Sequence, residues 1–214
     1  PLHLLAKNDD YKAVKAILAH VEAQYPDSLY STINAKDAFD TTLLHLAARS
    51  GRLNVVKCLV DKGANIHARA EIYQTPLYSA VKSGELDMVK YFISKGANID
   101  TENWFDRNLL YCAVESENFD IAEYLIEEKG IDVTAKYSNG DTLLHEVARY
   151  ESLNALKYFV DQGIDVDIKG KYNGTLLHWT VVKERIDVVR YLIEQGADVN
   201  AKGNDDLTPL YWAV

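Results

Sequence analysis

Four histidines recur at one place in a repeated pattern, and imidazole is the side chain best suited to acid–base or metal chemistry near neutral pH. Each of them follows a leucine, at His3, His45, His145 and His178. A catalytic or metal-binding histidine needs a nucleophile, a carboxylate or a second ligand close by. Tyrosine takes the same place at Tyr78, Tyr111 and Tyr211, and a phenol could not simply replace a metal-binding imidazole. We therefore expect a structural role for these histidines, no catalytic residue and no metal ligand.

The other residues capable of chemistry form no reactive motif. Cys58 and Cys112 lie far apart on expected helices, which predicts small buried side chains in a reducing compartment rather than a disulfide or a metal site. The sequence contains no Gly-x-x-x-x-Gly-Lys phosphate loop, no Gly-x-Ser-x-Gly elbow and no Cys-x-x-Cys pair. His20 and His67 stand outside the repeated pattern, and we expect both to be exposed. The sequence thus predicts neither an enzyme nor a bound cofactor.

The elements that position these residues follow from an internal repeat. Aligned on the histidine position, the repeated boxes stand at His3, His45, Tyr78, Tyr111, His145, His178 and Tyr211. The intervals between them are 42, 33, 33, 34, 33 and 33 residues. A period of 33 residues indicates small supersecondary units that bury their apolar faces by stacking on one another.

The repeated boxes carry a family resemblance. Thr75-Pro76-Leu77-Tyr78 and Thr208-Pro209-Leu210-Tyr211 resemble the Thr-Pro-Leu-His box of ankyrin repeats, and Gly196-Ala197-Asp198-Val199-Asn200-Ala201 is similar to the end of such a repeat. The resemblance covers nearly the whole chain. It implies an all-α solenoid of helix-turn-helix units with projecting β-hairpin fingers, in which the box histidines tie neighbouring turns together by hydrogen bonds. A fold by itself names no activity.

We expect a single ankyrin-repeat domain over residues 1–214, with about six complete or near-complete repeats and a truncated seventh. Its boxes are expected at 1–3, 42–45, 75–78, 108–111, 142–145, 175–178 and 208–211. Because the chain opens inside a box and stops inside an expected helix, we interpret it as a segment of a longer protein.

Several positions depart from the repeat. The surplus in the first interval lies around residues 21–30, and we expect a helix from Tyr11 to about Gln24 followed by an extended loop that ends near Ile33. Such an insertion is either a tolerated surface bulge or part of a binding face. One extra residue near Glu128-Lys129-Gly130 accounts for the interval of 34 residues. The turn glycine is replaced in three units, which predicts less stable turns at Glu117, Glu151 and Glu184.

The expected fingers carry large side chains where the family usually has short polar ones. These side chains are Phe39, Ile72, Tyr73, Trp104, Phe105, Arg107, Tyr137 and Tyr172. Exposed apolar and aromatic residues on loop tips usually mark an interaction site, and Trp, Tyr and Arg are frequent binding hot spots. The alternative is that the rings lie on adjacent fingers and shield the hairpin backbone.

The first helices of the units supply the other wall of the expected groove. By resemblance, the exposed candidates on the concave side include Arg49, Lys82, Glu115, Arg149, Tyr150 and Lys183. This row is mildly basic, which favours a partner segment with acidic side chains. A second row, Tyr91, Tyr124, Tyr158 and Tyr191, recurs along the second helices, where we expect packing rather than binding.

Charge and hydropathy limit the kind of partner. The chain has 214 residues, 23 Lys and Arg against 32 Asp and Glu, and a formal net charge of -9. This balance argues against nucleic acid, and no apolar run approaches the length of roughly 18 residues needed to insert in a membrane. We expect a monomeric intracellular module in the cytoplasm, or in the host cytoplasm if the chain belongs to a bacterial effector.

The sequence therefore predicts protein–protein recognition by a scaffold or adaptor. Two other hypotheses stay open. The chain could be the targeting or substrate-recruiting segment of a larger enzyme, effector or toxin whose catalytic domain lies elsewhere, or a structural array with no specific partner.

Overall fold

The computed structural model describes residues 11–71, 74–100, 108–150 and 152–214. These residues form helices joined by turns and loops, and the part of the chain described holds no extended strand. Only two isolated antiparallel bridges occur there, Lys36 with Thr42 and Lys136 with Thr142. The chain divides into two compact units, residues 1–121 and 122–214, which are treated separately below.

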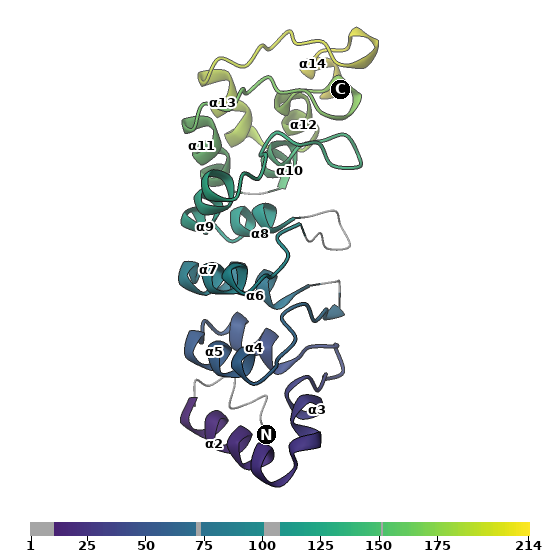
Figure 1. Ribbon diagram of the computed structural model, residues 1–214. Helices are drawn as coiled ribbons and strands as arrows, with labels where there is room; N and C mark the ends of the chain where they lie inside the picture. The colour runs from purple at the N-terminus through teal and green to yellow at the C-terminus, as the bar shows by residue number, and fades with distance from the viewer. Residues whose placement is uncertain (1–10, 72–73, 101–107, 151) are drawn as a thin grey trace. The chain divides into compact units, whose positions relative to one another are not determined.

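The first unit is built from pairs of short helices joined by tight turns (Figure 1). Its elements are α2 (Tyr11–Gln24), η1 (Pro26–Ser28), α3 (Leu29–Ile33), α4 (Leu43–Arg49), α5 (Leu53–Asp61), α6 (Pro76–Ser83), α7 (Leu86–Ser94) and α8 (Leu109–Glu115). Helix α4 packs against both α5 and α6, and α6 packs against α7 and α8. The second helices bury the apolar stripe that their sequences predict, with Val55, Leu59, Met88 and Phe92 fully enclosed. The all-helical repeat predicted from the sequence is confirmed.

The second unit follows the same plan. After α9 (Phe119–Glu123), which crosses the boundary between the units, come η3 (Tyr124–Glu128), α10 (Leu143–Tyr150), α11 (Leu153–Asp161), η4 (Lys171–Asn173), α12 (Leu176–Val182), α13 (Ile186–Glu194), η5 (Asn204–Asp206) and α14 (Pro209–Trp212). Helix α10 packs against α11 and α12, and α12 packs against α13 and α14. Ala155, Leu156 and Leu192 lie in the core between the helix pairs.

The helices begin where the box residues can satisfy free backbone N–H groups. The Thr75 hydroxyl oxygen accepts a hydrogen bond from the Tyr78 N–H at 3.2 Å, and Pro76 stands at the first helical position, where its missing N–H costs nothing. Asn108 takes over the capping role in the next repeat and accepts from the Tyr111 N–H at 2.9 Å. The Thr-to-Asn exchange therefore keeps the cap, as the sequence predicted.

The turn between paired helices needs a residue with positive φ, which explains why glycine is common there. Gly84 ends α6 with a φ of 79°. Glu117 and Glu184 occupy the equivalent turns with φ values of 54° and 55°, so a side chain is held in the left-handed region. This conformation costs roughly 1–2 kcal/mol for a residue other than glycine. The predicted weakness of these two turns has this physical basis, whereas Glu151 lies outside the described residues.

The insertion differs from its prediction. Helix α2 covers the predicted span Tyr11–Gln24, but the residues after it form η1 and α3 instead of an extended loop. Pro26 can start a helical turn because its φ is already fixed near the helical value. Ile33 at the end of α3 is fully buried and anchors the segment to the unit.

The extra residue of the fourth repeat is absorbed inside a helix. Residues Tyr124–Glu128 form a π-helix, whose hydrogen bonds span one more residue than those of an α-helix. Leu125 is fully buried, so the widened turn keeps its apolar anchor in the core. The surplus therefore begins a few residues before the predicted position near Gly130. Among the described helices, none is long and apolar enough to cross a membrane.

Candidate functional site

The box histidines connect each repeat to the next. The Thr42 N–H donates to His45 Nδ1 at 3.3 Å, and His45 Nε2 lies 3.0 Å from the Gln74 carbonyl oxygen in the following repeat. A carbonyl can only accept, so Nε2 carries the proton and Nδ1 is the acceptor. His145 and His178 make the same contacts, with the carbonyl oxygens of Gly174 at 3.3 Å and Leu207 at 3.1 Å.

These contacts require a neutral imidazole, and the environment favours it. Burial lowers the pKa of His145 to about 4, although the neighbouring Asp141 carboxylate acts in the opposite direction. Burial also lowers the pKa of His45 and of His178. Within the described ranges, no three His, Cys, Asp or Glu side chains come together as a metal site. The histidines therefore serve as structural ties, as predicted.

Two of the predicted finger residues are prominent on the surface. Phe39 is 62% exposed and Tyr172 is 52% exposed, whereas Tyr137 is half-buried. The first finger is held by Asp37, whose carboxylate accepts from the N–H groups of Phe39 and Thr41, both at 2.9 Å. The other finger candidates, Ile72, Tyr73, Trp104, Phe105 and Arg107, lie outside the described residues.

The Tyr172 fingertip is held in an unusual backbone conformation. Tyr172 has φ 56° and ψ 27°, and Asn173 follows with φ 51°. The Gly170 N–H donates to the Gly174 carbonyl at 2.9 Å and closes the turn. A bulky residue in this region is an outlier that the surrounding structure must enforce. The ring stays partly in contact with the unit, because its centroid lies 6.4 Å from that of Trp179.

The row predicted along the first helices is only partly a basic groove. Arg49, Lys82 and Lys183 are exposed as expected. The Lys82 ammonium lies 4.0 Å from the Glu115 carboxylate. Lys183 Nζ lies 5.1 Å from the ring centroid of Tyr150, which is itself exposed. The free positive charge in this row is therefore smaller than the sequence suggests.

The prediction for Arg149 is wrong, because its side chain is buried. Its guanidinium donates to Asp141 Oδ2 at 2.6 Å and to Glu146 Oε1 at 2.8 Å, and it stacks 3.7 Å from the centroid of the Trp179 ring. The other Asp141 oxygen accepts from the Lys171 N–H at 2.8 Å. This cluster joins α10 to the Tyr172 fingertip and removes Arg149 from the groove. Glu146, three residues before Arg149 on one helix, was a sequence signal for the pairing.

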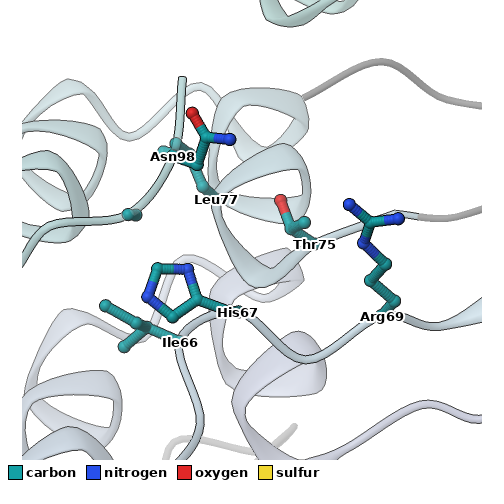
Figure 2. Close-up of a pocket in the computed structure, with 7 residues that line it drawn as sticks. Ile66, His67, Arg69, Thr75, Leu77 and Asn98 are labelled. Carbon is teal, nitrogen blue, oxygen red and sulfur yellow. The ribbon is translucent and has the colours of Figure 1, made fainter. Parts of the chain in front are cut away.

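A small cavity that the sequence did not indicate lies in the first unit. It measures about 100 Å³ and is bordered by Ile66, His67, Arg69, Thr75, Leu77, Ala97 and Asn98. Figure 2 shows Asn98 and Leu77 above His67 and Ile66, with Arg69 on the far side of Thr75. His67 is exposed, as predicted.

Comparison with known proteins decides the family. The model of ankyrin repeats matches in three copies, over residues 1–70, 66–137 and 134–203. The chain belongs to the ankyrin repeat family. Repeats of this family are generally non-catalytic and bind proteins through their extended surfaces. No curated protein matches the chain.

Solved ankyrin structures resemble the chain over most of its length. The ankyrin repeat domain of Bcl-3, a member of the IkappaB protein family, has a TM-score of 0.76 at 23% identity and matches over 100% of this chain and 93% of its own. The human ASB11 ankyrin repeat domain has a TM-score of 0.76 at 22% identity, over 100% and 91%. These two matches show the fold alone.

A third match is a chain from the complex of the Bd0816 predatory endopeptidase of Bdellovibrio bacteriovorus with the immunity protein Bd3460. Its TM-score is 0.68 at 26% identity, over 90% of this ankyrin chain and 96% of that chain.

Sequence reasoning missed two exposed aromatic residues of the ankyrin array. Tyr25 and Tyr30 in the insertion are 62% and 64% exposed. The signal was available, because both residues flank Pro26 in a segment that the repeat does not require. The tyrosine row on the second helices instead packs as expected, since Lys57 lies 5.7 Å from the Tyr91 ring and Lys157 lies 5.6 Å from the Tyr191 ring.

Proposed function

We propose that this ankyrin chain is a recognition module that binds a protein or peptide partner through its fingertips and the exposed ends of its first helices. Phe39 and Tyr172 act as apolar anchors. Arg49, Lys82 and Lys183 favour a partner segment with acidic side chains. The finger residues Ile72, Tyr73, Trp104, Phe105 and Arg107 have the same proposed role.

The observation that carries this proposal is the presentation of Tyr172. Its ring is half exposed on a turn whose backbone lies in the left-handed region, a conformation that a tyrosine does not favour by itself. The Arg149 cluster below it holds the Lys171 N–H through Asp141 and so supports the turn. A ring that is fixed before binding loses little conformational entropy when a partner covers it.

Charge gives the second line of support. Arg49 and Lys82 stand on α4 and α6 of one unit, and Lys183 follows α12 of the other, each exposed at the equivalent end of its helix. In a chain of net charge -9, such a recurrence at one face differs from the average surface. Complementary charges chiefly raise the association rate and select the partner.

The test is capture of partners by the full-length protein, followed by variants of the fingertips. Tyr172→Asn removes the ring but suits the left-handed turn, because asparagine adopts this conformation readily. Combined with Phe39→Ala, it should abolish partner capture and leave the thermal unfolding midpoint unchanged. Ile193→Ala, a truncation of a comparably exposed side chain on α13, is the matched control. Unchanged capture by the double variant contradicts the proposal.

A second candidate is a recruiting arm of a larger enzyme or bacterial effector. The likeness to a chain of the endopeptidase–immunity protein complex favours this candidate, because that chain takes part in a complex that contains an enzyme. The same fingertips would then bind the substrate or inhibitor of the enzyme. Sequencing the complete gene and assaying its product distinguish this candidate from a free-standing adaptor.

The two cysteines support a cytoplasmic setting for either function. Both are free thiols, and burial raises the pKa of Cys112 to about 12. Burial also raises the pKa of Cys58, so neither thiol is activated as a nucleophile. Free thiols of this kind are typical of reducing compartments.

A further inference from the structure

Within each unit, a polar side chain in one turn can reach the backbone of the next turn, 31 residues later. Asn34 Oδ1 accepts a hydrogen bond from the Asn65 N–H at 2.7 Å in the first unit. The Asp167 carboxylate accepts from the Asp198 N–H at 3.1 and 3.2 Å in the second unit. In both places a side-chain oxygen fills the space between consecutive turns and satisfies a backbone donor.

His67 stands at the same place as Asn34 and Asp167, and Asn98 follows it by the same 31 residues. Among the described residues, no acceptor meets the Asn98 N–H, and no hydrogen bond is made by the His67 ring. The cavity of about 100 Å³ described above opens at this place, with His67 and Asn98 both on its border (Figure 2). The space filled by a side-chain oxygen elsewhere is therefore open here.

The border of this cavity is rich in hydrogen-bond donors and holds no carboxylate. His67, Arg69, Thr75 and Asn98 contribute the polar groups, and Ile66, Leu77 and Ala97 supply an apolar floor. The Thr75 hydroxyl oxygen already accepts from the Tyr78 N–H, so its own proton can be donated outward. Such a set of donors suits an anionic acceptor.

The other turns do not offer the same combination. Thr134 occupies the place of His67 in the second unit, but its hydroxyl donates back to Asp132 at 2.6 Å. Asp165 stands there in the place of Asn98, and its negative charge would repel an anion. Asn65 is neutral like Asn98, but Asn34 already fills its neighbourhood.

We propose that the cavity between His67 and Asn98 binds a carboxylate, supplied by an aspartate or glutamate side chain of a protein partner. The carboxylate takes the position that Asp167 takes internally and accepts from the Asn98 N–H, with Arg69 and His67 as flanking donors. The source of the carboxylate rests on the proposed recognition function, whereas the carboxylate site itself does not. The site lies away from the fingertips and adds a specific acidic contact.

The site is tested by titrating the isotopically labelled chain with potassium acetate, with potassium chloride at equal ionic strength as reference, and following the backbone amide resonances. We expect acetate-specific shifts at His67 and Asn98. Arg69→Gln should weaken acetate binding about tenfold, the loss expected for one charge-assisted hydrogen bond. Absence of acetate-specific shifts, or shifts centred elsewhere, overturns the proposal.

An internal replacement sharpens the test. His67→Asp places a carboxylate where Asp167 has one, so it should protect the Asn98 amide from hydrogen exchange and abolish the acetate shifts. The reverse change, Asp167→His, is the matched control and should leave the acetate shifts at Asn98 as they are. If His67→Asp keeps full acetate binding, the cavity is not the binding site.

The source of the carboxylate is separated by two short peptides, Gly-Ser-Asp-Ser-Gly and its Asn-containing twin, both amidated at the C-terminus. Shifts at Asn98 with the Asp peptide alone support a protein side chain as ligand. Acetate binding without peptide binding overturns that source and assigns the cavity to a free carboxylate. The Phe39→Ala, Tyr172→Asn variant should bind acetate normally, so failure of the fingertip proposal is distinguishable from failure of this one.

Discussion

At the scale of single residues, each box histidine joins a threonine in its own repeat to a carbonyl in the next. The exchange of His for Tyr at Tyr78 and Tyr111 breaks this pattern without breaking the fold, since both rings are buried at the same place. The tie is therefore one way of filling a position whose main requirement is burial between repeats. Its distinctive consequence is sensitivity to pH.

We expect the free energy of unfolding to fall as the pH drops below about 6.5, the pKa of an unperturbed histidine. In the fold the pKa of His145 is lowered to about 4, so the unfolded chain takes up a proton that the native chain refuses. The stabilisation is complete above the unfolded pKa and is lost as the pH falls toward the folded one. For His145 the loss amounts to at most about 3 kcal/mol.

Urea unfolding between pH 7.5 and 4.5 measures this effect. His145→Gln should flatten the dependence, while His20→Gln at an exposed position should leave it unchanged. An identical slope for His145→Gln and the parent chain would refute the assignment.

Arg149 shows how much a buried charge depends on its partners. Arg149→Met removes the cation between Asp141 and Glu146, and Asp141 is left buried without its ion pair. We expect a loss of about 3–5 kcal/mol in the free energy of unfolding. Arg190→Met on the exposed face of α13 provides the comparison, with an expected change below about 0.5 kcal/mol. Denaturant unfolding of both variants checks the difference, and equal stability would mean that the cluster is not stabilising.

At the scale of elements, the repeat tolerates an added residue by changing the type of one helix. The π-helix at Tyr124–Glu128 widens one turn and leaves Leu125 in the core. An insertion in a loop would instead have moved the following turn. The longer surplus in the first repeat is treated differently, since η1 and α3 form a helical element of their own.

Deletion of Glu128 should convert the π-helical turn to a regular α-helical one, because it restores the interval of 33 residues. We expect a change of less than about 1 kcal/mol in the free energy of unfolding, in either direction. Deletion of Asp161 in α11 is the control, and it should destabilise more because it shifts a regular helix out of register. Hydrogen exchange at residues 124–128 and urea unfolding measure the outcome, and equal damage by both deletions would contradict the interpretation.

At the scale of the whole molecule, a chain of net charge -9 carries its exposed cations in a recurring place along the first helices. The burial of Arg149 interrupts this recurrence in the second unit. Charge steering therefore falls to Arg49, Lys82 and Lys183, and such steering is weakened by salt.

Reversing these three charges together, Arg49→Glu, Lys82→Glu and Lys183→Glu, should weaken binding of a captured partner and flatten the dependence of its affinity on salt. The expected loss is about ten- to a hundredfold, with most of the change in the association rate. The same reversal at Lys57, Lys90 and Arg190 on the second helices controls for net charge. Binding that responds equally to both sets would refute a specific basic row.

The sequence alone determined the period, the helix pairs and the caps. Thr75, Pro76 and Asn108 act locally, within a few residues of their own helix, so their effect follows from type and spacing. The structural role of the histidines was also readable, since Tyr78 and Tyr111 replace them at the same place.

Only the tertiary structure decided which side chains meet between repeats. The burial of Arg149 depends on Trp179 in the following repeat, and the opening at His67 depends on a contact with Asn98 that is not made. The period specifies which positions are neighbours, but the side chains at those positions vary from repeat to repeat. Whether a charged group is paired, stacked or open to solvent is set by that variation, because electrostatic and packing energies depend on distances that spacing along the chain does not supply.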